Sequence, residues 1–159
     1  MIVYTGRYTF RNPDGRMVEF GPGDWMRRWT SGFGVAHDFL ADYDSQAFHS
    51  PGPGGRFSFT RLPEVLRTAR WLQVVDGAPE PIVAWSRIQN AISIIGTPWT
   101  FQDSNCQDTV SAVVTGRPQS FQRDALYGLG IVLVAGALFW PSGKRSGSCL
   151  WARRKLCGA

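Results

Sequence analysis

The stretch "VAHDFLADYDSQAFHS" (residues 35–50) decides how the first half of the chain folds. Its side chains alternate between two faces: Val35, His37, Phe39 and Ala41 on one, and Asp38 and Asp42 on the other. A period of two is typical of a strand, and "SQAFHS" (45–50) is predicted to be its antiparallel partner. The sequence therefore predicts that His37 and His49, the two histidines of the chain, lie on neighbouring strands.

Further strands are expected on the N-terminal side of this pair. The turn "RNPDG" (11–15) separates the strand-like segments "MIVYTGRYTF" (1–10) and "RMVEF" (16–20). A third strand-like segment, "DWMRRW" (24–29), follows a break at "GPGD" (21–24). The N-terminal third is thus predicted to be an antiparallel meander, in a sheet built mostly from residues 1–60.

The middle of the chain changes to helical periodicity. "RLPEVLRTARWL" (61–72) predicts a helix from Pro63, and "LQVVDG" (72–77) predicts a strand and a turn. "EPIVAWSRIQNAISIIG" (80–96) predicts a longer helix whose apolar stripe is formed by Ile82, Trp85, Ile88, Ala91, Ile92 and Ile95. With another helix near 105–115, the sequence predicts an α+β fold in which helices pack an antiparallel sheet.

Charge and cysteine content limit the classes of function. The net charge of +5 lies entirely after residue 124, because residues 1–124 carry equal numbers of acidic and basic side chains. This balance argues against a nucleic-acid-binding protein. The 3 cysteines have no CxxC spacing, and the N-terminus has no basic, apolar secretory signal. We therefore expect a reducing, cytoplasmic setting, with no bound metal and no cofactor.

The last 35 residues differ from the rest of the chain. Residues 126–140 contain no charged side chain, and a basic tail follows them directly. Such a run beside such a tail predicts a membrane anchor, although a buried core helix or hairpin is the alternative. The predicted organisation is a domain at 1–124, a hydrophobic segment at 125–143 and a basic tail at 144–159.

Cys106 stands in "FQDSNCQDTVSAVVTG" (101–116), a stretch that predicts a helix ending at Gly116. Ser104 and Gln107 match the S-x-x-Q capping box, so Cys106 would lie in the first helical turn beside Asn105. Free amides and the helix dipole there would lower the pKa of the thiol. Packing in the core is the alternative role for such a cysteine.

An imidazole that accepts the thiol proton would make Cys106 a nucleophile, and a second polar group would orient that imidazole. His37 and His49 suit these two roles if their strands pair. Gly23–Asp24, His37, His49 and Asn105–Cys106, in this order and approximate spacing, resemble the lecithin:retinol acyltransferase-like family. The helix ending at Ile95–Gly96 before Trp99, and Gly116 followed by Ser120–Gln122, also fit, so that the resemblance covers roughly residues 20–122.

The resemblance implies a circularly permuted NlpC/papain-like fold and a thiol-dependent acyltransferase or phospholipase A-type hydrolase. Cys106 would be the nucleophile, His37 the base and His49 the group that orients it, supported by Asn105, Ser104 and Gln107. The implied substrate is a phospholipid or another acyl ester, the implied setting is a membrane, and no nucleic acid is expected as a partner. Two alternatives remain open: a cysteine peptidase or amidase with the same triad, and a non-enzymatic membrane-tethered protein.

Overall fold

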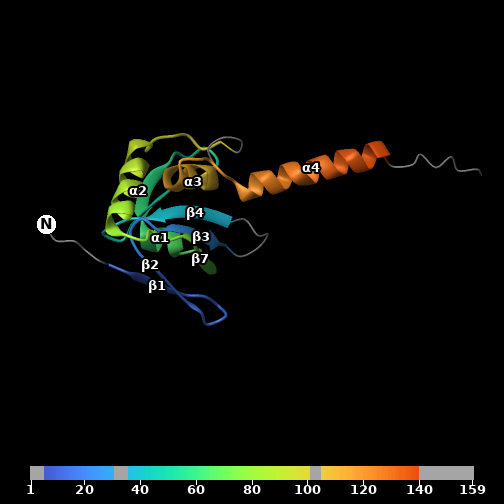
Figure 1. Cartoon of the computed structure of the whole chain (residues 1–159). Helices are drawn as coiled ribbons and strands as arrows, with labels where there is room; N and C mark the ends of the chain where they lie inside the picture. The colour runs from blue at the N-terminus through green and yellow to red at the C-terminus, as the bar shows by residue number, and fades with distance from the viewer. Residues whose placement is uncertain (1–5, 31–35, 101–104, 140–159) are drawn as a thin grey trace, which may run out of the picture.

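The computed structural model describes residues 6–30, 36–100 and 105–139, which form an α+β fold of antiparallel sheets packed by helices (Figure 1). The strands in this part of the chain are β1 (Tyr8–Arg11), β2 (Met17–Phe20), β3 (Trp25–Trp29), β4 (Ala36–Ala41), β5 (Gln46–His49), β6 (Ser58–Arg61) and β7 (Trp71–Asp76). The helices are α1 (Leu62–Leu66), α2 (Pro81–Ser93), α3 (Cys106–Thr115) and α4 (Phe121–Phe139).

The predicted pairing of the two histidine strands is confirmed. β4 and β5 pair antiparallel, with Phe39 opposite His49 and Ala41 opposite Ala47. They lie inside a five-stranded sheet of order β6-β5-β4-β3-β7, in which the paired neighbours are all antiparallel. β4 is the central strand, and its residues from Asp38 to Ala41 are buried.

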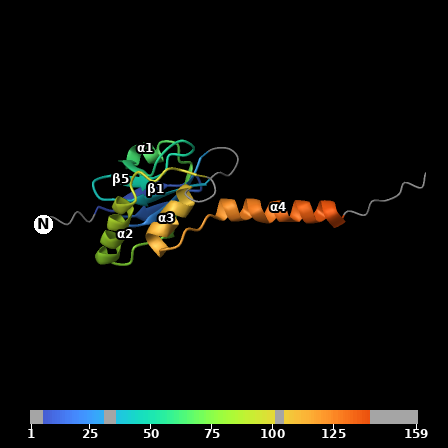
Figure 2. The same cartoon turned by 90° about the horizontal axis from the view of Figure 1, so that it is seen from above.

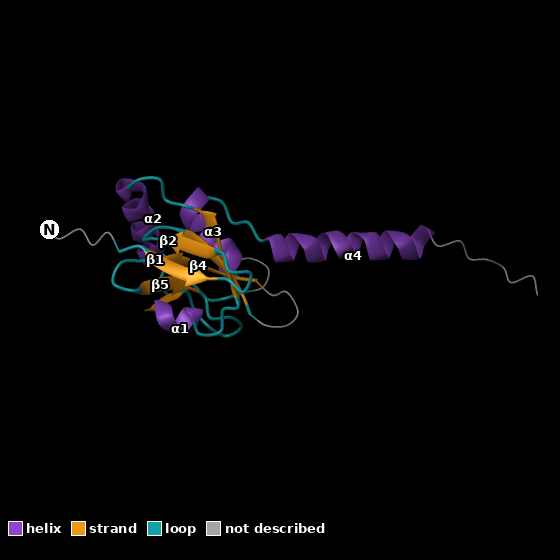
Figure 3. Cartoon of the chain, turned by 90° about the horizontal axis from the view of Figure 1, so that it is seen from below, coloured by secondary structure: helices purple, strands orange, loops and turns teal. Residues whose placement is uncertain are grey.

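Side-chain alternation divides the core between the two faces of this sheet. On one face, Phe39, Ala41 and Ala47 pack with α1 and with Phe20 of β2. On the other face, Leu40 and Phe48 pack with α2 and α3, which contact each other (Figure 2). The view from below shows α1 beside β5, which it contacts (Figure 3). β4 is therefore covered on both faces, and α3 packs directly on it.

Most of the strand residues lie within 1–60, as predicted, but they form two sheets, because β1 and β2 pair separately and β7 completes the larger sheet beside β3. Two predictions about the helices are corrected. The helix expected over 61–72 is the short α1, since Trp71–Asp76 pairs as a strand instead. In α2 the buried face is centred on Ala84, Ile88 and Ala91, which leaves exposed the side chains of Ile82, Trp85 and Ile92.

Gly23 and Asp24 have structural roles in this fold. Gly23 has φ +81, and a Cβ there would lie 2.4 Å from Cα of Ala84, so a side chain at this position would separate α2 from β3. The Asp24 carboxylate accepts hydrogen bonds from the amides of Gly21 (2.8 Å) and Ala78 (2.7 Å). The pair therefore joins the start of β3 to the segment that leads into α2.

α4 projects away from the rest of the molecule (Figures 1 and 2). It begins at Phe121, four residues before the predicted boundary at 125. Its side chains from Asp124 to Val132 are exposed, including those of Leu126, Leu129, Ile131 and Val132, so these residues do not belong to the core. Within the described ranges, no helix combines the length and the apolar character that crossing a membrane requires. The predicted basic tail, 144–159, lies outside the described residues.

Candidate functional site

The first turn of α3 carries Cys106, as predicted, but Asn105 caps the helix. Its side-chain oxygen accepts hydrogen bonds from the amides of Gln107 (2.9 Å) and Asp108 (3.1 Å). Ser104, predicted to be the cap, lies outside the described residues and precedes this position. The predicted capping box is therefore wrong. In a capping box the Gln107 side chain would bond the amide of the cap residue, whereas here it bonds Ser120 and Gln122.

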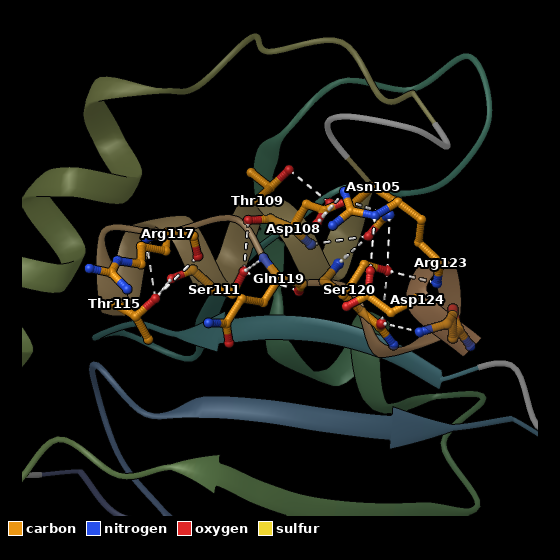
Figure 4. Close-up of polar contacts among 12 residues, drawn as sticks. Asn105, Asp108, Thr109, Ser111, Thr115, Arg117, Gln119, Ser120, Arg123 and Asp124 are labelled. Carbon is orange, nitrogen blue, oxygen red and sulfur yellow. Dashed lines mark hydrogen bonds and ion pairs between the residues drawn. The ribbon is translucent and has the colours of Figure 1, made fainter. Parts of the chain in front are cut away.

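Gln107 and Asp108 are fully buried in a polar network that binds α3 to the chain after it (Figure 4). Oε1 of Gln107 accepts hydrogen bonds from Oγ of Ser120 and from the amide of Gln122, both at 3.1 Å. The Asp108 carboxylate forms an ion pair with Arg123 at 3.0 Å. The first turn of α3, which holds Cys106, is therefore fixed from its outer side by residues 120–123.

Burial dominates the electrostatics of the cysteine. The Cys106 side chain is 7% exposed, and its burial raises the pKa of the thiol from 9.0 to about 11. Hydrogen bonding from the backbone amides of Asp38, Gln107 and Cys106 itself lowers this pKa by a smaller amount. The predicted lowering of the thiol pKa by the helix start is therefore wrong, because desolvation outweighs the amides. At neutral pH the resting group is the thiol.

The backbone amide of Asp38 interacts with the thiol and lowers its pKa, whereas the charge of the Asp38 carboxylate raises it. The Asp38 side chain points into the core, where it is fully buried. It accepts hydrogen bonds from Nε1 of Trp25 (2.8 Å) and from Nε and Nη2 of Arg27 (2.8 and 2.9 Å). Asp38 thus pairs its charge with Arg27 and leaves its backbone amide to the sulfur of Cys106.

The structure brings the two histidines together. Nε2 of His37 lies 3.1 Å from Nδ1 of His49, with the rings nearly perpendicular at 79°. One nitrogen of such a contact donates and the other accepts. If His37 donates through Nε2–H, its Nδ1 is left unprotonated, which is the form that a general base requires.

Both imidazoles are neutral at physiological pH. Burial lowers the pKa of His37 from 6.5 to about 3, and the charge of Arg28 and the second histidine lower it further. Burial and Arg28 likewise lower the pKa of His49 to about 4. The Arg28 guanidinium also interacts electrostatically with Cys106. The charge of Arg28 therefore acts on the thiol and on both histidines.

The predicted contact between Cys106 and His37 stays a prediction, unlike the contact between the two histidines. The hydrogen bonds of the described residues include none between Cys106 and His37, although Cys106 interacts with the backbone of Asp38, the residue after His37. Sequence reasoning missed Arg28, Asp38 and Ser120, whose contacts depend on strand register and on the path of residues 117–123. The strand-like segment "DWMRRW" was the available signal for Arg27 and Arg28, because adjacent residues of a strand lie on opposite faces of the sheet.

Comparison with known proteins identifies no family for this chain. No protein-family model matches the chain, and no curated protein matches it.

Acid should destabilise the protein through the histidine pair. Below pH 6.5 the unfolded chain binds protons at His37 and His49, whereas the folded chain binds them only near pH 3 and 4. Stability is therefore complete above pH 6.5 and is lost as the pH falls toward those values. We expect the free energy of unfolding in urea to drop by about 1–2 kcal/mol per histidine between pH 7 and pH 5.

The double variant His37→Gln/His49→Gln removes both groups and serves as the comparison. Its free energy of unfolding should change less over the same pH range than that of the native chain. Equal pH dependence in the two proteins would show that other groups cause the acid loss.

Proposed function

We propose that the protein is a thiol-dependent acyltransferase or lipid acyl hydrolase, a member of the permuted branch of the NlpC/papain-like enzymes. The observation that carries the proposal is the contact of Nε2 of His37 with Nδ1 of His49 at 3.1 Å, in a chain whose Cys106 lies in the first turn of a helix that packs on the strand of His37. In such an arrangement the first imidazole acts as the base and the second fixes its tautomer. The order of the residues along the chain, with both histidines before the cysteine, agrees with a permuted fold.

The reaction has two acyl-transfer steps. In the first, Nδ1 of His37 takes the proton from Cys106 as the sulfur attacks the ester carbonyl, and the amides of Asp38, Gln107 and Cys106 are near enough to support negative charge. The carbon–oxygen bond breaks, His37 returns the proton to the departing alkoxide, and an acyl-thioester remains. In the second, water or an acceptor alcohol or amine attacks the thioester and restores the thiol.

One observation favours a second candidate, a non-enzymatic protein in which Cys106 only fills the core. The thiol is 7% exposed, and burial raises its pKa to about 11. A thiol in this setting becomes a nucleophile only if His37 takes its proton. The enzyme candidate therefore requires His37 to raise the reactivity of Cys106, and the non-enzymatic candidate does not.

An acyl-enzyme experiment separates them. The full chain is mixed with phosphatidylcholine in mixed micelles, quenched in acid, digested and analysed by mass spectrometry. We expect a hydroxylamine-labile acyl group on the Cys106 peptide, absent in Cys106→Ala and reduced at least about 100-fold in His37→Gln, because general-base catalysis contributes about 10²–10⁴-fold. Cys149→Ser and Cys157→Ser are the matched controls and should acylate normally. Acylation of all cysteines to the same extent, or of none, would contradict the proposal.

We further propose that the protein attaches to membranes through residues 125–159, with the folded domain on the cytoplasmic side. The support is the unpartnered apolar surface of α4, where Leu129 is 55% exposed, Ile131 70% and Val132 66%. Apolar side chains so exposed on a projecting helix gain free energy on entering a lipid interface. The five basic residues of the tail would add attraction to anionic lipid.

Vesicle binding tests the attachment in the intact chain. The double variant Leu129→Asp/Ile131→Asp should reduce sedimentation with phosphatidylserine-rich vesicles roughly tenfold or more, since two apolar side chains lose their burial. Met17→Asp/Phe59→Asp, which makes the same kind of change at exposed positions of β2 and β6, should not. Binding that is unaffected by the α4 variant would refute attachment through α4.

A further inference from the structure

Four arginines of the described residues are buried or half-buried, and Arg28 alone among them has no acidic partner. Three other enclosed arginines each form an ion pair: Arg27 with Asp38, Arg87 with Asp76, and Arg123 with Asp108. The side chain of Arg28 is half-buried, and its Nε is a buried donor with no hydrogen-bond partner. Its one recorded hydrogen bond is neutral, from Nη1 to Oγ1 of Thr68 at 2.6 Å.

The sheet register places this cation at the candidate site. Arg28 of β3 stands directly opposite His37 of β4, and opposed residues of an antiparallel pair lie on the same face with Cβ atoms about 5 Å apart. On its other side Arg28 is opposite Leu72 of β7, so no charged residue flanks it in the sheet. The next residue after His37, Asp38, directs its amide to Cys106. Arg28 therefore lies beside His37, and its charge interacts electrostatically with Cys106.

A cation enclosed in this way normally has a counter-ion, because removing a charge from water without a partner costs several kcal/mol. The neighbours of Arg28 do not supply one. Both nearby histidines are neutral, and its hydrogen-bond partner Thr68 is uncharged. The guanidinium keeps a donor available for an oxygen anion and is the planar group best suited to bind carboxylate or phosphate.

We propose that Arg28 binds an anionic oxygen group, a phosphate or a carboxylate, of the molecule whose acyl group reacts with Cys106. The inference rests on the proposed function and specifies its substrate class: acyl esters that carry a negative charge close to the scissile bond. Arg28 is then a specificity-determining residue, because a neutral ester with the same acyl chain would leave the cation unpaired.

Alkylation of the thiol tests the anion site without any acyl chemistry. Iodoacetate and iodoacetamide attack the same sulfur and differ by one negative charge. The ratio of their rates at Cys106 therefore reports the cation, whereas the thiolate fraction affects both rates equally. At pH 8.5 and low salt we expect Arg28→Gln to lower the iodoacetate-to-iodoacetamide ratio roughly tenfold, as loss of one nearby charge predicts. Peptide mass spectrometry follows each cysteine separately.

Three comparisons make the result specific. Arg61→Gln, an equal loss of charge at the exposed end of β6, should leave the ratio unchanged. Arg28→Lys keeps the charge and should keep most of the native iodoacetate-to-iodoacetamide ratio. In the native chain the ratio should fall as sodium chloride rises, which tests the same point if Arg28→Gln does not fold. A ratio at Cys106 that is unchanged in Arg28→Gln, or that does not fall with salt, would overturn the proposal.

A second measurement separates the failure of this inference from failure of the proposed function. Monoacylglycerol and monoacylglycerol phosphate with the same acyl chain are compared as acyl donors. Arg28→Gln alters the electrostatics of the thiol for both donors, so the anion site is reported by the difference: kcat/KM should fall at least about tenfold more for the phosphate than for the neutral ester. Equal losses on both donors would contradict the anion site while leaving the acyl transfer standing. If the native chain cleaves neither donor, the proposed function fails, and the alkylation ratio still decides whether the anion site exists.

Discussion

The buried carboxylate of Asp38 fixes the part of the sheet on which the site depends. It is fully enclosed and accepts hydrogen bonds from Nε1 of Trp25 and from Nε and Nη2 of Arg27. A slip of one residue between β3 and β4 would move this charge to the other face of the sheet, away from its donors. The ion pair therefore selects the register that places Arg28 opposite His37 and directs the amide of Asp38 to Cys106.

Burial, which stabilises this arrangement, also sets its chemistry. The same enclosure that raises the pKa of Cys106 lowers the pKa of His37 and His49, so the resting groups are a thiol and two neutral imidazoles. A preformed thiolate–imidazolium pair is not the ground state of such a site. Reactivity must come from proton transfer during attack, and the charge of Arg28, coupled to all three groups, favours the thiolate and opposes the imidazolium.

Local patterns in the sequence predicted the elements better than they predicted the contacts. Alternation over 35–50 was enough to place His37 and His49 on paired strands, and the apolar spacing before Gly116 was enough to define α3. The β7 strand was assigned in part to a helix, because its pairing with β3 is long-range. The raised pKa of Cys106 could not be read from the helix start, since it depends on how much protein covers the sulfur. Arg28 and Ser120 were missed because their roles arise from register and from the return of residues 117–123 to α3.

The central claim is that the two histidines form a neutral pair in which His37 donates through Nε2 and keeps Nδ1 free. Proton-nitrogen correlation spectra of the imidazole rings test this directly, and with 2 histidines in the chain a single variant, His49→Gln, assigns the signals. At pH 6 the account predicts two neutral rings, with the proton of His37 on Nε2. A charged ring at pH 6, or His37 protonated on Nδ1, would contradict it.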